Sequence, residues 1–135
     1  MNFSILFSNI QWFPVVVMTL LSFVIGMLWH RPFLFGRAWV KENYPDGSPH
    51  DINAPLVFGG TAIVHFIALA ALSAFVSATG GLNGFLGGLS ISLFWILTAI
   101  AGTYLFASRS LKLLAIDAGM YIVLFSLCGF ILGVW

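Results

Sequence analysis

Four side chains that can exchange protons or bind ligands lie inside long apolar stretches of the sequence: Asp117, Tyr121, Cys128 and His65. If residues 111–135 form a helix, a rotation of about 100° per residue places the first three on one face. A carboxylate at the centre of a membrane helix costs about 2.5–3.5 kcal/mol on insertion scales, so ionisable residues there are functional candidates. These four residues form the candidate intramembrane polar site of the chain.

Two roles remain open for Asp117, the only acidic residue inside a predicted span. It follows Ser110 by seven residues, a rise of roughly 10 Å, so Arg109 or Lys112 can reach it near the membrane surface. It is either a structural carboxylate with such a partner or a group that handles a proton or ligand. His65, near the centre of another span, is either a neutral histidine bonded to a hydroxyl or carbonyl group, or part of a proton relay with Asp117 or a cofactor ligand.

Enzymatic chemistry has little support in the residue pattern. The adjacent His50 and Asp51 have no second pair at metal-ligand spacing, and the single cysteine excludes an internal disulfide. No serine or cysteine lies at a recognisable spacing from a base, and no glycine-rich loop has the phosphate-binding pattern. We therefore expect no metal, no cofactor and no enzymatic activity.

The composition indicates which solvent surrounds these residues. Of the 135 residues, 61% are hydrophobic and only 7% are charged, whereas soluble domains carry roughly 25% charged residues. Such a chain cannot cover a water-facing surface, so its solvent is the lipid bilayer. A net charge of +1 provides no basic surface for nucleic acid. The length fits a single domain.

The apolar segments predict an all-α membrane protein with four transmembrane helices. A span needs about 20 apolar residues to cross a hydrocarbon core of roughly 30 Å. Four segments meet this need, arranged as two hairpins, over about 12–29, 56–79, 85–107 and 111–135. The loop 30–55 holds six of the nine charged residues. Within it, a short helix over 33–42 is expected to lie on the membrane surface, with Arg37 and Lys41 toward the headgroups and Trp39 in the apolar interface.

The basic residues predict the orientation of the spans. All of them lie in the two connections that four spans place on one side: Arg31, Arg37, Lys41, Arg109 and Lys112. Because basic short loops remain cytoplasmic, we expect both termini outside the cell. Trp12 and Trp135 would then lie at the outer interface and Trp29 and Trp39 at the inner one, as aromatic belts do. Trp95, in mid-span, is expected to pack between helices.

Small residues predict where helices approach each other closely. The glycines expected at helix contacts are Gly84, Gly88, Gly119, Gly129 and Gly133. We therefore favour a non-enzymatic bundle that acts through self-association or membrane partners. The first alternative is a small transporter or channel with a polar path near Asp117, Tyr121 and His65. The second is a cofactor-binding subunit of a membrane enzyme, which would need histidines paired across a cavity.

Residues 29–39, WHRPFLFGRAW, resemble a Trp-Tyr-x-Pro-Leu-x-Phe-Gly-Lys-x-Trp pattern that follows the first helix of a bacterial membrane-protein family. Residues 109–113, 116–121 and 129–135 are similar to its C-terminal pattern. The family is the domain of unknown function 1761, and the resemblance implies four transmembrane helices in the bacterial cytoplasmic membrane and no assigned activity. The family pattern has other residue types at His30 and Arg31, so neither inherits a role. It accepts asparagine at Asp117, which favours a hydrogen-bonding site over an obligatory proton carrier.

Overall fold

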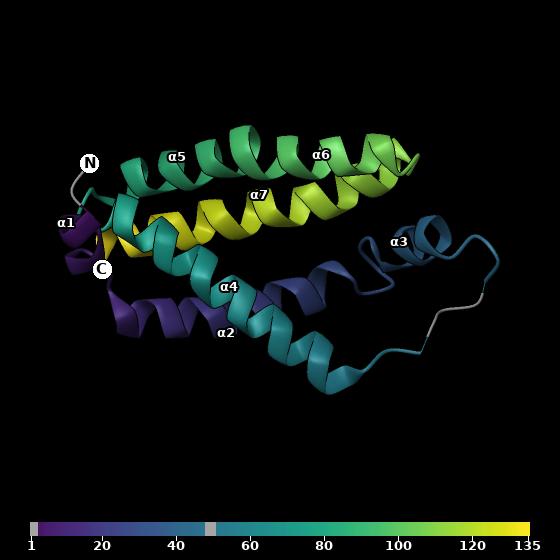
Figure 1. Cartoon of the computed structure of the whole chain (residues 1–135), viewed down its shortest axis with the longest axis horizontal. Coiled ribbons are helices and arrows are strands. Elements are labelled where there is room, and N and C mark those ends of the chain that lie inside the picture. The colour runs from purple at the N-terminus through teal and green to yellow at the C-terminus, as the bar shows by residue number, and fades with distance from the viewer. Residues whose placement is uncertain (1–2, 48–50) are drawn as a thin grey trace.

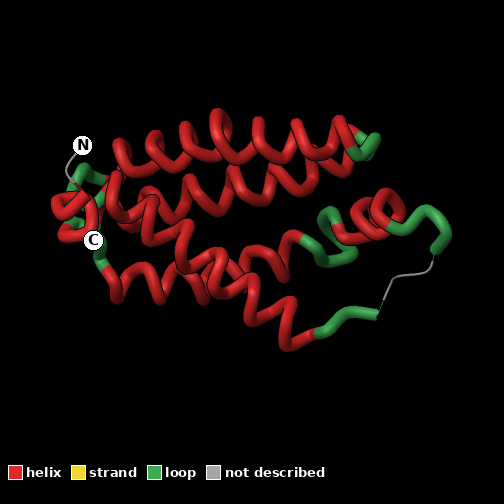
Figure 2. Tube along the Cα trace, in the orientation of Figure 1, coloured by secondary structure: helices red, strands yellow, loops and turns green. Residues whose placement is uncertain are grey.

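The computed structural model describes residues 3–47 and 51–135, and in these residues it contains helices and loops but no strand (Figure 2). The elements are α1 (Phe3–Ser8), α2 (Trp12–Trp29), α3 (Gly36–Asn43), α4 (Ala54–Val76), α5 (Gly81–Ile91), the π-helix η1 (Ser92–Ile96), α6 (Leu97–Phe106) and α7 (Leu111–Val134). Four helices are long and apolar enough to cross a membrane: α2, α4, the continuous α5–η1–α6 helix and α7. The predicted all-helical architecture with four apolar helices is confirmed. His50 lies outside the described residues.

Local caps set the observed helix ends. The side chain of Asn53 accepts a hydrogen bond from the backbone N–H of Leu56 (3.1 Å), so α4 begins at Ala54, two residues before the expected start. The hydroxyl of Ser110 accepts from the N–H of Leu113 (3.1 Å) at the start of α7. Side-chain acceptors of this kind satisfy backbone donors that have no partner within the helix. The turn between α4 and α5 includes Gly80 at a φ of +87°, a conformation that favours glycine.

The two ends of the bundle differ in chemistry. Figure 1 shows both termini and the turn between α4 and α5 at one end, which we call the termini end. The helix α3 and the turn between α6 and α7 lie at the other end. We call this the basic end, because it holds all five lysine and arginine residues. The short helix α3 begins at Gly36, three residues later than predicted.

Helices α5 and α7 approach each other closely through their glycines. A Cβ atom at Gly84 would overlap the carbonyl oxygen of Gly129, and one at Gly129 would overlap the carbonyl oxygen of Gly84. A Cβ at Gly88 would overlap the carbonyl oxygen of Phe125. The backbone N–H of Gly80 donates to the carbonyl oxygen of Gly133 (2.9 Å) and ties the same interface. These predicted contact glycines therefore join two helices of one chain.

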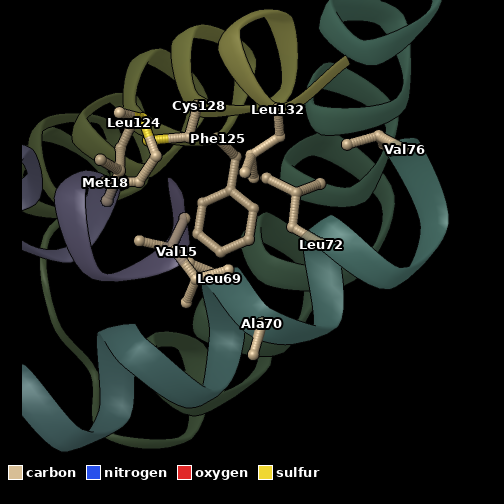
Figure 3. Close-up of a cluster of buried hydrophobic side chains, with 10 residues drawn as sticks. All are labelled: Val15, Met18, Leu69, Ala70, Leu72, Val76, Leu124, Phe125, Cys128 and Leu132. Atoms are coloured by element: carbon tan, nitrogen blue, oxygen red, sulfur yellow. The ribbon is translucent and has the colours of Figure 1, made fainter. Parts of the chain in front are cut away.

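The apolar core lies between α2, α4 and α7 (Figure 3). Phe125 and Leu132 of α7 lie against Leu69 and Leu72 of α4, and α2 contributes Val15. Cys128 is fully buried in the same cluster. Cys128 therefore lies among apolar side chains rather than beside Asp117.

The third span is interrupted by the five-residue π-helix Ser92–Ile96. Here the i→i+5 pattern turns the side chains relative to the flanking α-helical turns. Trp95, expected to pack between helices, is instead 64% exposed on the bundle surface. The prediction that Trp95 packs between helices of this chain is therefore wrong.

Candidate functional site

Asp117 lies at the centre of a hydrogen-bonded cluster toward the basic end. The indole N–H of Trp39 donates to one carboxylate oxygen (2.9 Å), and the hydroxyl of Tyr104 donates to the other. These donors come from α3 and α6, so the carboxylate of α7 joins three elements. In the described residues, the one ion pair is Lys112 with Glu42 (3.6 Å), so neither Arg109 nor Lys112 forms an ion pair with Asp117.

A tight turn between α2 and α3 brings Trp39 to Asp117. The N–H of Phe35 donates to the carbonyl oxygen of Trp29 (3.2 Å), and that of Gly36 donates to the carbonyl oxygen of Arg31 (3.1 Å). A Cβ atom at Gly36 would overlap the carbonyl oxygen of His30. Only glycine fits this position with the turn unchanged.

A second indole from the same segment docks one residue earlier on α7. The N–H of Trp29 donates to the carbonyl oxygen of Ile116 (2.9 Å), and its ring packs on Phe35 with centroids 4.5 Å apart. Gly119 lies beneath this ring, where an added Cβ would approach to 3.1 Å. Gly119, expected at a helix contact, thus receives an aromatic side chain. Trp29 and Trp39 therefore bind protein groups, which was not expected of residues assigned to an aromatic belt.

A partly open cavity of about 350 Å³ adjoins Asp117. Its walls come from α3, α6 and α7 and from His30, which follows α2. The lining residues are His30, Trp39, Ile100, Tyr104, Asp117, Met120 and Tyr121. The structure brings together two of the predicted site residues here, Asp117 and Tyr121, as the helical spacing predicts. The cavity therefore combines one carboxylate with three aromatic side chains and an imidazole.

His65 lies away from Asp117 and has a different partner. Its Nδ1 lies 2.7 Å from the hydroxyl of Ser22, which donates to the carbonyl oxygen of Thr19 (2.6 Å). A serine hydroxyl has one proton, so with that proton directed to Thr19, Nδ1 of His65 is the donor to Ser22. The ring of Tyr121 contacts that of His65 edge-on, with centroids 6.0 Å apart. Tyr121 therefore lies between the His65 pair and the cavity beside Asp117.

The basic residues near the site contact groups other than the Asp117 carboxylate. The guanidinium of Arg109 donates to the side-chain oxygen of Asn43 (3.3 Å) and lies over the ring of Tyr104, 5.4 Å from its centroid. A hydrogen bond from Ser110 and the nearby Lys112 ammonium lower the pKa of Glu42, while burial opposes them. Arg31, Arg37 and Lys41 are exposed.

The sequence analysis missed Trp39 and Tyr104 as partners of Asp117. Tyr104 lies 13 residues before Asp117, across the turn between α6 and α7. When a short turn joins two antiparallel helices, residues at similar distances from the turn lie side by side. The positions of Tyr104 and Asp117 in the sequence could therefore have indicated their contact. For Trp39 the signal was weaker, since its amphipathic helix predicts an apolar face without indicating whether lipid or protein covers it.

Comparison with known proteins identifies the family but no relative of established activity. No curated protein and no solved structure matches the chain. Residues 13–133 match the family described as "Protein of unknown function (DUF1761)". The matched residues include the four apolar helices, from the first turn of α2 nearly to the end of α7. The chain therefore belongs to this family.

Proposed function

We propose that this chain is a non-enzymatic integral membrane protein that binds a positively charged solute at Asp117 as a step in its passage, in the manner of a small transporter or channel. One observation carries the proposal. The carboxylate lies inside an apolar helix, receives hydrogen bonds from two neutral donors and adjoins a cavity of about 350 Å³. An ionised carboxylate in a membrane needs a partner of opposite charge, and a cation in the cavity would provide it.

The polar groups beyond the cavity support a direction of passage. From Asp117 they continue through Tyr121 to the His65–Ser22 pair. Towards the termini end the apolar core follows, in which Val15 and Leu69 are fully buried. A solute would therefore enter from the basic end and need a rearrangement of α2 and α4 to leave. Because basic loops remain cytoplasmic, we further propose that this end faces the cytoplasm and that both termini lie outside.

Replacement of Asp117 by asparagine is expected to reduce cation flux strongly. The amide oxygen still accepts a hydrogen bond, but the charge that binds the solute is gone. In proteoliposomes with an inside-negative potential, uptake of inorganic and organic cations should fall by at least about tenfold, which corresponds to about 1.4 kcal/mol of binding. The matched control is Asp51→Asn, which removes the same charge from an exposed loop position outside the cavity. Absence of uptake by the parent protein would rule out the proposal.

Self-association is a second candidate function, and a specific feature of α4 favours it. Four predicted contact glycines already lie at the interface of α5 and α7 within the chain, so they are unavailable to a second copy: Gly84, Gly88, Gly129 and Gly133. Gly59 and Gly60 of α4 have open space where a Cβ would lie. Small residues on an open helix surface allow a second helix to approach closely in a membrane. We propose this surface as the contact between copies.

Gly60→Leu is expected to weaken such a dimer at least about tenfold, since overpacking at a close contact costs roughly 1–3 kcal/mol. Single-molecule photobleaching in liposomes at several protein-to-lipid ratios measures the dimer fraction. Gly102→Leu provides the control, because Gly102 also faces open space but lies on α6. An equal dimer fraction in both variants and the parent would exclude the α4 surface.

A further inference from the structure

We propose that the cavity beside Asp117 takes an organic ammonium group rather than an inorganic cation. This inference rests on the proposed function, because it assigns the chemical class of the solute bound at Asp117. The ammonium group belongs either to a free solute or to the headgroup of a lipid.

The walls of the cavity favour a large, weakly hydrated cation. Besides Asp117, they present the aromatic side chains of Trp39, Tyr104 and Tyr121 and the imidazole of His30. The faces of tryptophan and tyrosine rings attract cations, and cages of such rings bind quaternary ammonium groups. The apolar side chains of Ile100 and Met120 complete the lining, and these suit the alkyl substituents of an organic ammonium.

Divalent inorganic cations lack the ligands they need here. Ca²⁺ takes about 6–8 oxygen ligands, and Mg²⁺ needs near-ideal octahedral coordination. The cavity contributes one carboxylate, and its two oxygens already accept hydrogen bonds from Trp39 and Tyr104. The described residues contain no group of three histidine, cysteine or acidic side chains that could hold a metal ion. Charge from one carboxylate combined with aromatic faces therefore selects an organic cation.

A cation already occupies part of this environment. The guanidinium of Arg109 lies over the ring of Tyr104, 5.4 Å from its centroid, within the range of a cation–π contact. Arg109 is held there by Asn43 rather than by Asp117. The ring of Tyr104, whose hydroxyl donates to Asp117, thus already has a positive charge at its face. Asp117 itself forms no ion pair among the described residues.

The indole N–H of Trp39 provides a direct readout of binding, because it donates to Asp117 (2.9 Å). Its NMR resonance is measured in protein with isotope-labelled tryptophan, in nanodiscs of phosphatidylglycerol, and assigned with Trp39→Phe. Tetraethylammonium should shift the resonance saturably, whereas K⁺ at equal ionic strength should not. Asp117→Asn should weaken the apparent affinity roughly 10- to 100-fold, as expected for loss of a charged partner.

A second pair of variants tests the aromatic wall separately from the charge. Tyr121→Leu removes a ring that makes no hydrogen bond to Asp117, and it should weaken tetraethylammonium binding roughly 2- to 5-fold. Phe94→Leu, which removes an exposed ring that does not line the cavity, should leave the affinity unchanged. Phosphatidylethanolamine in the nanodisc distinguishes the two sources. If phosphatidylethanolamine competes with tetraethylammonium, the site binds a lipid headgroup. If it does not compete, the site binds a free solute.

Two results would overturn the inference in different ways. An equal shift with K⁺ would exclude the organic class and leave cation binding at Asp117 intact. Absence of any response to organic or inorganic cations would overturn both the inference and the proposed function. Equal affinity of the parent and Asp117→Asn would show that the shift arises elsewhere and would also overturn the inference.

Discussion

Gly129→Ala is expected to lower the free energy of unfolding, although alanine favours helix formation over glycine. The added Cβ would overlap the carbonyl oxygen of Gly84 and approach the Cα of Gly88 to 3.3 Å. Since the contacted atoms belong to the backbone of α5, only a separation of the two helices relieves the overlap. Overpacking of this kind costs roughly 1–3 kcal/mol, and contact with backbone rather than a flexible side chain places the cost at the upper end.

The matched control is Gly102→Ala in α6, where an added Cβ meets nothing within 4 Å. There the intrinsic preference for alanine in a helix, up to about 1 kcal/mol, acts without opposition. Unfolding of both variants in mixed micelles with increasing denaturing detergent, followed by tryptophan fluorescence, compares the two changes. Opposite signs are expected. A stabilised Gly129→Ala variant would show that α5 and α7 do not pack through their glycines.

The four apolar helices could be predicted because the signal is local. About 20 consecutive apolar residues are enough to cross a bilayer, and breaks such as Gly80 mark where each helix ends. The short helix α1 and the π-helical turn at Ser92–Ile96 could not be predicted. Their residues are apolar, as in the neighbouring helices, so composition does not distinguish them.

The predicted site grouped Cys128 with Asp117 by the angle around the helix alone, without regard to the distance along the helix. Cys128 shares the angular sector of Asp117, but it lies eleven residues further, a rise of roughly 16 Å. At that depth α7 meets α2 and α4, and Cys128 is fully buried among apolar side chains. Tyr121, one helical turn from Asp117, remains at the cavity. The angle around a helix therefore predicts shared surroundings only over one or two turns.

The hydrogen bond between Trp39 of α3 and Asp117 could not be predicted, because the position of α3 depends on the turn that precedes it. Trp39 lies 78 residues from Asp117 in sequence, and an amphipathic helix in a loop fits a membrane surface as well as a protein surface. What decides between them is the turn at residues 30–36, whose geometry requires glycine at position 36. The two indoles of this segment then bind successive residues of α7, Ile116 and Asp117.

Gly36→Ala is accordingly expected to detach α3 from α7. A Cβ atom would overlap the carbonyl oxygen of His30, so the turn must open and carry Trp39 away from Asp117. A cost of roughly 1–3 kcal/mol raises the population of the detached state about 5- to 140-fold. Trypsin cleavage after Arg37 and Lys41 measures this population, because proteolysis of a rapidly opening segment follows its equilibrium fraction.

Gly59→Ala provides the control, since Gly59 faces open space on α4; its cleavage rate should equal that of the parent. Trp39→Phe separates the turn from the hydrogen bond, because it removes the indole donor to Asp117 and keeps Gly36. It should raise cleavage less than Gly36→Ala, since Trp29 still binds Ile116. If Gly36→Ala is cleaved at the parental rate, the turn does not hold α3 in place. If instead Trp39→Phe is cleaved as fast as Gly36→Ala, the hydrogen bond from Trp39 to Asp117 holds α3 in place. The main role of the Asp117 carboxylate is then to bind the loop between α2 and α4.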